Sequence, residues 1–140
     1  MRILEVLTER RRLGNRGERA AARYLWLHGY RILERNFVRR GAEIDIIARK
    51  GDTIAFVEVK TRVREHQSPR EARPAAAVTP EKQRKIIAAA QCYFPAMEEG
   101  IRYRFDIIEV YYSEKSKLKA EQILHLPHAF HRNSSQRRTL

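Results

Sequence analysis

Residues 43–60 have the sequence EIDIIARKGDTIAFVEVK, in which two apolar runs flank Gly51-Asp52. β-Branched residues are frequent in both runs, which favours strands over helices. Gly51-Asp52, preceded by Lys50, is typical of a tight turn between two antiparallel strands. We therefore expect residues 43–60 to form a β-hairpin.

The predicted hairpin carries charges inside its apolar runs. Side chains alternate along a strand, so Glu43, Asp45 and Ile47 should share one face. Glu58 and Lys60 should share one face of the partner strand. If the two charged faces coincide, Asp45 and Glu58 approach closely, and unit charges about 4 Å apart repel by roughly 4 kcal/mol at an effective dielectric constant of about 20. A cation or a proton must offset this repulsion.

Two interpretations of these charges remain open from the pattern alone. Carboxylate oxygens suit Mg²⁺ or Mn²⁺, and a magnesium site often uses only one or two protein carboxylates. Lys60, about 7 Å from Glu58 along the strand, could then act on a water molecule or stabilise charge at phosphorus. The other interpretation is a cross-strand salt bridge on a solvated face.

Length and net charge indicate the number of domains and the class of molecule that the protein binds. The chain has 140 residues, a length that suits one domain. Its 29 Lys and Arg against 17 Asp and Glu give a net charge of +12, which favours binding to a polyanion through counterion release. Charge alone does not separate DNA from RNA.

Other classes of protein are disfavoured. Cys92 is the single cysteine, so an intramolecular disulfide is excluded, and no Cys or His cluster has zinc-ligand spacing. Residues 1–12 lack the apolar core of a signal peptide, and no stretch approaches the roughly 20 apolar residues of a membrane span. We expect a cytoplasmic protein with no membrane partner.

The rest of the chain predicts an α/β domain in which a mixed sheet, with the order α-β-β-β-α-β, is flanked by helices. Gly29 fits the residue after a helix, and Thr79-Pro80-Glu81 fits the start of one. The expected elements are a helix at about 15–28, strands at 30–37, 43–47, 56–60 and 103–111, a helix from 79 that ends before Pro95, and a short strand at 122–126.

The domain is expected to span residues 1–131, with a basic N-terminal extension at 1–12. Residues 63–78 contain two prolines and three arginines without a period, which predicts a long mobile loop. We expect Arg64, Arg70 and Arg73 in it to contact nucleic acid. Residues 132–140 form a basic, serine-containing segment that we expect to be a disordered tail.

Three polar features outside the hairpin allow more than one interpretation. Glu18 lies on the packing face of the first predicted helix, where it is either a functional carboxylate or the partner of an Asn15 capping box. Asp106 is expected to have a structural role, pairing with Arg104 or making another buried polar contact, and metal binding is the less favoured alternative. His125 and the histidines at 128 and 131 are expected to be surface residues.

An ordered set of motifs extends from about Leu13 to Tyr111. It comprises Gly14, Gly17-Glu18, Tyr24-Leu25, Gly29-Tyr30, Asn36, Glu43-Ile44-Asp45, Phe56-Val57-Glu58-Val59-Lys60-Thr61-Arg62, Lys82, Ala89-Ala90 and Arg104-Phe105-Asp106. In this set the chain resembles the PD-(D/E)XK nuclease superfamily. Within it, the sequence is most similar to the small bacterial YraN-type family, itself similar to archaeal-type Holliday junction resolvases.

The resemblance implies a restriction-endonuclease-like fold and a metal centre for Mg²⁺, with Mn²⁺ as a substitute. Asp45, Glu58 and the carbonyl of Val59 would be metal ligands, Lys60 the catalytic lysine, and Glu18 a further carboxylate at the same centre. Arg19, Arg62 and Lys82 would contact nucleic acid, although Lys82 also fits a snorkelling surface lysine. The chain departs from the pattern at Ala42, where related chains usually have glycine, and at Ile44, where the superfamily motif has proline.

The expected function is metal-dependent hydrolysis of nucleic acid phosphodiesters. The resolvase likeness favours DNA, including branched DNA, and junction resolution would require a homodimer with two active sites. Two alternatives are a nucleic-acid-binding module that keeps the fold without turnover and an RNA- or ribosome-associated basic protein. In the latter, Asp45, Glu58 and Lys60 would form a structural ion-pair network.

Overall fold

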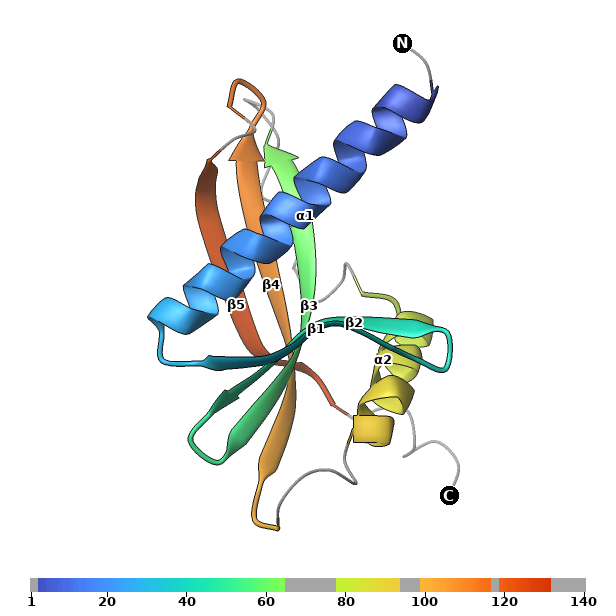
Figure 1. Ribbon diagram of the computed structural model, residues 1–140, viewed down its shortest axis with the longest axis vertical. Helices are drawn as coiled ribbons and strands as arrows, with labels where there is room; N and C mark the ends of the chain where they lie inside the picture. Colours follow the sequence, from blue (N-terminus) through green and yellow to red (C-terminus); the bar gives the residue numbers. More distant parts are fainter. Residues whose placement is uncertain (1–2, 65–77, 94–98, 117–118, 132–140) are drawn as a thin grey trace.

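A computed structural model describes residues 3–64, 78–93, 99–116 and 119–131 (Figure 1). Residues 65–77, with Arg70 and Arg73, and the predicted tail at 132–140 lie outside the described residues. The elements are α1 (Ile3–Leu27), β1 (Arg31–Arg39), β2 (Ala42–Lys50), β3 (Thr53–Arg64), α2 (Pro80–Tyr93), β4 (Arg102–Ser113) and β5 (Ala120–Phe130).

The strands form one mixed sheet in the order β1-β2-β3-β4-β5. β3 and β4 are parallel, whereas the other neighbouring pairs are antiparallel. Parallel neighbours need a long crossover connection, and the segment that contains α2 supplies it. The result is a single α/β domain consistent with the restriction-endonuclease-like fold that we expected.

The two helices cover opposite faces of the sheet. α1 crosses β3, β4 and β5, while α2 lies beside β2 (Figure 1). Ala21 and Leu25 of α1 pack in one buried cluster with Val57, whereas Ile86 of α2 packs in a second cluster with Phe56. β3 is therefore buried on both faces from Ile54 to Val57, and its charged residues follow this stretch, beginning with Glu58.

The structure corrects several boundaries. α1 begins at Ile3, so most of the predicted extension at 1–12 is helix, and Asn15 lies inside it. The capping-box interpretation of Glu18 is therefore wrong. Val63 and Arg64 belong to β3 instead of a loop. β4 is slightly longer than predicted, and β5 spans 11 residues where a short strand was expected.

The start of α2 is confirmed. The backbone N–H of Lys82 donates to Oγ1 of Thr79 at 3.2 Å, and Pro80 is the first helical residue. This cap fixes the first turn of α2 and with it the position from which the Lys82 side chain extends. None of the described helices is long and apolar enough to cross a membrane.

Gly17 sets how closely α1 approaches the sheet. A Cβ at this position would lie 2.0 Å from Oγ1 of Thr61 on β3, much closer than two such atoms can approach. The glycine therefore allows the helix to lie against the strand, and it is followed directly by Glu18.

Candidate metal and phosphate site

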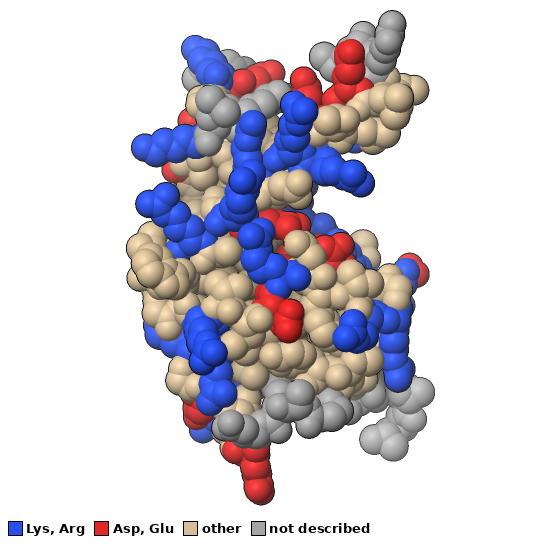
Figure 2. All heavy atoms as spheres, in the orientation of Figure 1, with Lys and Arg blue, Asp and Glu red and all other residues tan. Residues whose placement is uncertain are grey.

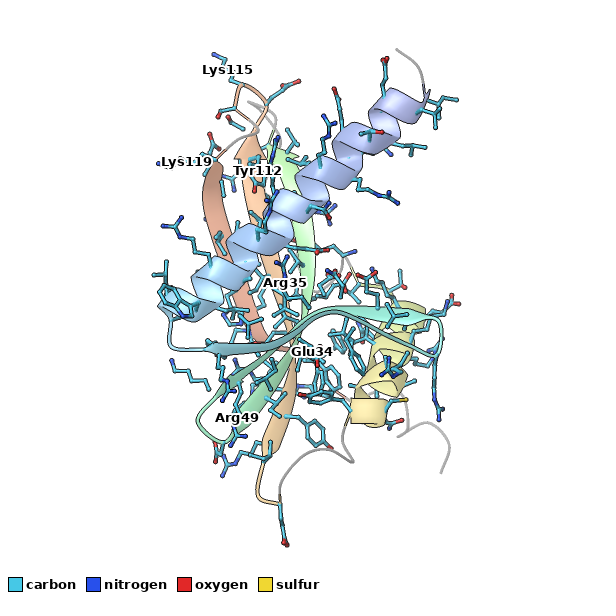
Figure 3. The ribbon with its side chains drawn as sticks, in the orientation of Figure 1. Glu34, Arg35, Arg49, Tyr112, Lys115 and Lys119 are labelled. Carbon is cyan, nitrogen blue, oxygen red and sulfur yellow. The ribbon has the colours of Figure 1, made fainter. Side chains whose placement is uncertain are left out.

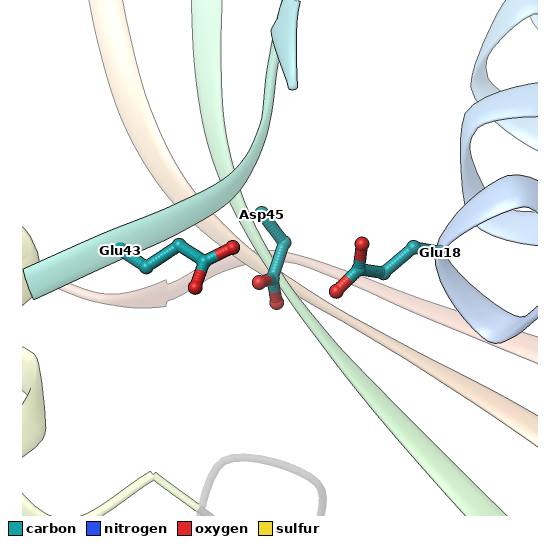
Figure 4. Close-up of side chains that lie close together, drawn as sticks. All are labelled: Glu18, Glu43 and Asp45. Carbon is teal, nitrogen blue, oxygen red and sulfur yellow. The ribbon is translucent and has the colours of Figure 1, made fainter. Parts of the chain in front are cut away.

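Three carboxylates converge between α1 and β2. Glu18 comes from α1, Glu43 and Asp45 come from β2, and one oxygen of each lies within 4.8 Å of the others. Figure 4 shows the side chain of Asp45 between the other two. We call these three residues the carboxylate cluster.

The cluster forms where β2 parts from β3. The β2–β3 pairing runs from Lys50↔Thr53 to Ile46↔Val57 and stops before Asp45, whereas β2 stays paired with β1 as far as Ala42. Figure 1 shows the β1–β2 hairpin diverging from β3 there.

Strict alternation along β2 is also broken at this point. Ile44 and Ile47 pack in the cluster on the α2 side of the sheet, whereas Ile46 packs in the cluster on the α1 side. The prediction that Ile47 shares a face with Glu43 and Asp45, opposite Ile44 and Ile46, is therefore wrong.

A hydrogen bond between Asp45 and Val59 spans the opening. Oδ2 of Asp45 accepts the backbone N–H of Val59 at 2.7 Å. The side chain thus takes the place of a backbone acceptor where the ladder ends, which satisfies a donor of β3. Asp45 is in this way held between the two strands.

Asn36 links the other two carboxylates. Its side-chain nitrogen donates to Oε2 of Glu18 at 3.1 Å and to Oε1 of Glu43 at 2.8 Å in the amide orientation that satisfies both. The residue has a φ of 53°, a left-handed conformation that asparagine tolerates better than most residues. Arg35, also on β1, lies between β1 and α1 in the view of Figure 3, and its charge partly offsets the rise that burial causes in the pKa of Glu18.

Glu58 lies beside the carboxylate cluster but pairs with lysines. Its side chain is only 5% exposed. Nζ of Lys82 lies 2.6 Å from Oε1 of Glu58, and Nζ of Lys60 lies 3.5 Å from the same oxygen. One buried carboxylate oxygen is therefore shared by two ammonium groups.

The carboxylates raise one another's pKa values. Burial and the charge of Glu58 raise the pKa of Asp45 to about 8, against the partial opposition of the Val59 hydrogen bond. Burial and the charge of Glu43 raise the pKa of Glu18. The repulsion expected from the sequence is therefore present, and at neutral pH a proton on Asp45 relieves it.

The pKa values of Lys60 and Lys82 shift in opposite directions. Burial and the neighbouring charge of Lys82 lower the pKa of Lys60, despite its pairing with Glu58. Burial also acts to lower the pKa of Lys82, but the hydrogen bond and charge of Glu58 outweigh it and raise the value. Lys60 is thus the lysine that loses its proton more readily.

These groups open onto a cleft of about 390 Å³. Its lining includes Glu43, Asp45 and Glu58 from the sheet and Glu81, Lys82 and Lys85 from α2. Figure 2 shows acidic atoms at the waist of this face, with many Lys and Arg side chains around and above them. An acidic centre with a basic rim can hold a cation and a phosphate together.

The described arginines that were predicted to contact nucleic acid lie outside this cleft. Arg19 and Arg62 are exposed. Arg64 donates to Oε1 of Gln122 at 2.7 Å, and its guanidinium lies 4.6 Å from the centre of the Tyr111 ring. Arg64 therefore packs on the sheet instead of extending from a mobile loop.

Sequence reasoning missed two residues of the site. Glu43 was placed on the face of Asp45 but given no role, although its spacing of two residues from Asp45 was a usable signal. Asn36 belonged to the family pattern, yet nothing in a single sequence connects it to Glu18.

Asp106 is structural in its contacts, as expected. It is fully buried and accepts hydrogen bonds from Nε of Arg104 at 2.9 Å and from the backbone N–H of His128 at 3.2 Å. Nε2 of His125 also lies 2.7 Å from its carboxylate. The expectation that His125 is a surface residue is wrong, because its side chain is only 11% exposed.

Comparison with known proteins identifies the family. The model of the "Uncharacterised protein family UPF0102" matches residues 17–110. The chain belongs to this family. UPF0102 is the YraN-type family, so the resemblance seen in the sequence is confirmed.

Individual UPF0102 proteins match most of the chain. A UPF0102 protein of Geobacter metallireducens is 47% identical over 119 residues, which cover 84% of this chain and 91% of the relative. One from Chlorobium phaeobacteroides is 50% identical over 99 residues, covering 70% and 75%. One from Caldanaerobacter subterraneus subsp. tengcongensis is 44% identical over 119 residues, covering 84% and 93%.

Proposed function

We propose that this protein is a metal-dependent nuclease that hydrolyses phosphodiester bonds of a nucleic acid, with DNA favoured. Support comes from the carboxylate cluster, whose oxygens lie within 4.8 Å of one another beside a buried Glu58 and two lysines. Carboxylates held this close need a proton or a cation between them, as the raised pKa of Asp45 indicates.

The donor set fits a hard divalent cation. Mg²⁺ and Mn²⁺ prefer oxygen ligands, and the described site offers four carboxylates without a thiolate. Asp45 would be the central ligand, with Glu18, Glu43 and Glu58 as the further carboxylates. The carbonyl of Val59 stays a predicted ligand. When bound, such a cation supplies Lewis-acid stabilisation of charge on phosphate oxygens.

The lysines would act on the phosphate and its attacking water. Because its pKa is lowered, Lys60 can accept a proton at Nζ or donate a hydrogen bond to developing negative charge. Lys82 and Lys85 at the rim would hold the backbone phosphates. The arginines of α1, including the exposed Arg19, would extend the basic path along the helix.

Cleavage assays test the proposal. Purified protein would be incubated with branched, flapped, single-stranded and plasmid DNA in Mg²⁺ or Mn²⁺. Asp45→Asn and Lys60→Ala should each reduce cleavage by at least about a hundredfold, the usual scale for removing a catalytic proton-transfer group. Asp52→Asn on the β2–β3 turn is the matched control. Cleavage by both the Asp45 and the Lys60 variant at the wild-type rate would refute the assigned site.

One observation favours an alternative function. Glu58 is already neutralised by Lys60 and Lys82, as it would be in a binding module without turnover. Such a module would bind DNA or RNA tightly and lose affinity steeply with salt, and it would cleave none of the substrates.

Gel filtration with and without branched DNA would test the homodimer that junction resolution requires.

A further inference from the structure

The ion pairs of Glu58 compete with any role of this residue as a metal ligand. Its carboxylate is buried, and the ammonium group of Lys82 contacts Oε1 at 2.6 Å. A cation that used this oxygen would lie next to that ammonium group, and the two positive charges would repel. Glu58 can therefore serve a cation fully only after Lys82 has moved away.

We infer that Lys82 couples nucleic acid binding to cation binding: it pairs with Glu58 until a backbone phosphate enters the cleft, then transfers its ammonium group to that phosphate. Glu58 is thereby released to the divalent cation. This inference rests on the proposed function, and it assigns Lys82 a positioning role that acts through Glu58. It predicts that cation and nucleic acid each strengthen binding of the other.

Lys82 is the lysine that can move. Its side chain is 44% exposed, lines the cleft and leaves the first turn of α2, whereas Lys60 extends from the central strand and is 23% exposed. A flexible four-carbon stem lets the ammonium group shift while the helix stays fixed.

The helix start also favours the exchange. The positive end of the α2 dipole disfavours a lysine ammonium and favours a phosphate. Glu58 holds Lys82 against this preference. The pair Lys60 and Lys82 adds repulsion, since both ammonium groups share one oxygen of Glu58. An arriving phosphate would satisfy Lys82 and relieve both effects.

Lys85 provides a matched control on the same helix. It also lines the cleft, but its ion pair is with Glu81 at 3.7 Å, and its side chain is 58% exposed. Lys85→Ala removes the same charge from the same cleft without altering the lysine that contacts Glu58. A general electrostatic effect on cation affinity should therefore appear in both variants, whereas the coupling should depend on Lys82 alone.

The first measurement is calorimetric titration of Mn²⁺ into the full chain without nucleic acid. Lys82→Ala should bind Mn²⁺ more tightly than Lys85→Ala, by a factor in the range of about 5 to 150 that is typical of coupled sites. Lys82→Gln, which keeps most of the stem, should behave like Lys82→Ala. Circular dichroism of each variant confirms that the fold is retained.

The second measurement follows a fluorescein-labelled DNA duplex by anisotropy with and without Ca²⁺, a cation with the same oxygen preference. A gel verifies that the duplex stays intact. In the wild type and in Lys85→Ala, Ca²⁺ should strengthen DNA binding by a larger factor than in Lys82→Ala. By reciprocity, DNA should strengthen Ca²⁺ binding by the same factor in each protein.

The outcomes separate this inference from the proposed function. Equal Mn²⁺ affinity in the Lys82 and Lys85 variants, or an undiminished Ca²⁺ effect on DNA binding in Lys82→Ala, would overturn the coupling and leave the nuclease site standing. If the wild type has no saturable Mn²⁺ site, or if its site persists in Asp45→Asn, both the coupling and the proposed nuclease site are overturned.

Discussion

Replacing Asp45 by asparagine should stabilise the protein at pH 8 and have little effect near pH 4. The unfolded side chain loses its proton near its ordinary pKa of 3.8, whereas the folded one keeps it up to about 8. Between these values the unfolded state binds fewer protons, so stability falls as pH rises. The asparagine side chain has no such proton to lose, and its amide oxygen can still accept the Val59 N–H.

The size of the effect follows from the two pKa values. At about 1.4 kcal/mol per pH unit, the upper limit is roughly 6 kcal/mol. Partial solvent access and relaxation of the carboxylate cluster reduce it, and we expect about 2 to 4 kcal/mol at pH 8. For a chain of 140 residues this corresponds to roughly 7 to 14 °C in Tm.

Urea and thermal denaturation, followed by circular dichroism from pH 4 to 9, would measure the difference between variant and wild type. That difference removes the contribution of titrating groups outside the carboxylate cluster and its neighbour Glu58. The control is Asp52→Asn, because the Asp52 side chain is 66% exposed and should show no comparable trend. If Asp45→Asn is less stable than the wild type at pH 8, the carboxylate is ionised and held by the lysines, and the reasoning fails.

Other expected outcomes concern packing, the buried ion pairs and cation binding. Gly17→Ala should destabilise by about 1 to 3 kcal/mol, because its Cβ would meet Thr61. Gly14→Ala, with nothing within 4 Å, should stabilise by up to about 1 kcal/mol in the same urea titration. Asp106→Ala should reduce stability by roughly 3 to 5 kcal/mol at pH 7, since it leaves the largely buried Arg104 guanidinium without its carboxylate partner. Burial raises the pKa of Asp106, but hydrogen bonds from His125 and Arg104 outweigh it and lower the pKa. The stability difference should therefore shrink as pH falls below about 4, and a constant difference would contradict that assignment. At pH 7, Mn²⁺ binding should release about one proton, because Asp45 must ionise. Calorimetry in two buffers of different ionisation enthalpy measures this, and identical enthalpies would speak against it.

Local signals in the sequence predicted local structure well. The hairpin followed from β-branched runs around Gly51-Asp52, and the start of α2 followed from Thr79-Pro80. Both depend on residues close in sequence, where turn and capping chemistry act directly. The early start of α1 was missed because arginines interrupt its apolar period, although leucine, glutamate and arginine are good helix formers.

Contacts between distant segments could not be predicted in the same way. The separation of β2 from β3 at Asp45 depends on sheet geometry, and it brings Glu43 into the carboxylate cluster while Glu58 pairs with Lys82. Each of these contacts joins residues whose relative position is set by packing of the whole domain.

The sequence by itself determined which chemical groups are available: an acidic residue and E-x-K on a hairpin, a helix carboxylate at Glu18 and a strongly basic chain. Only the tertiary structure decided which carboxylates lie against one another and which one pairs with lysines. Asp45 lies between Glu18 and Glu43 and is repelled by all three neighbouring carboxylates, most strongly by Glu58, whereas Glu58 alone among them pairs with lysines, from β3 and α2. The physical reason is that charges interact through distance and burial, and the fold sets both.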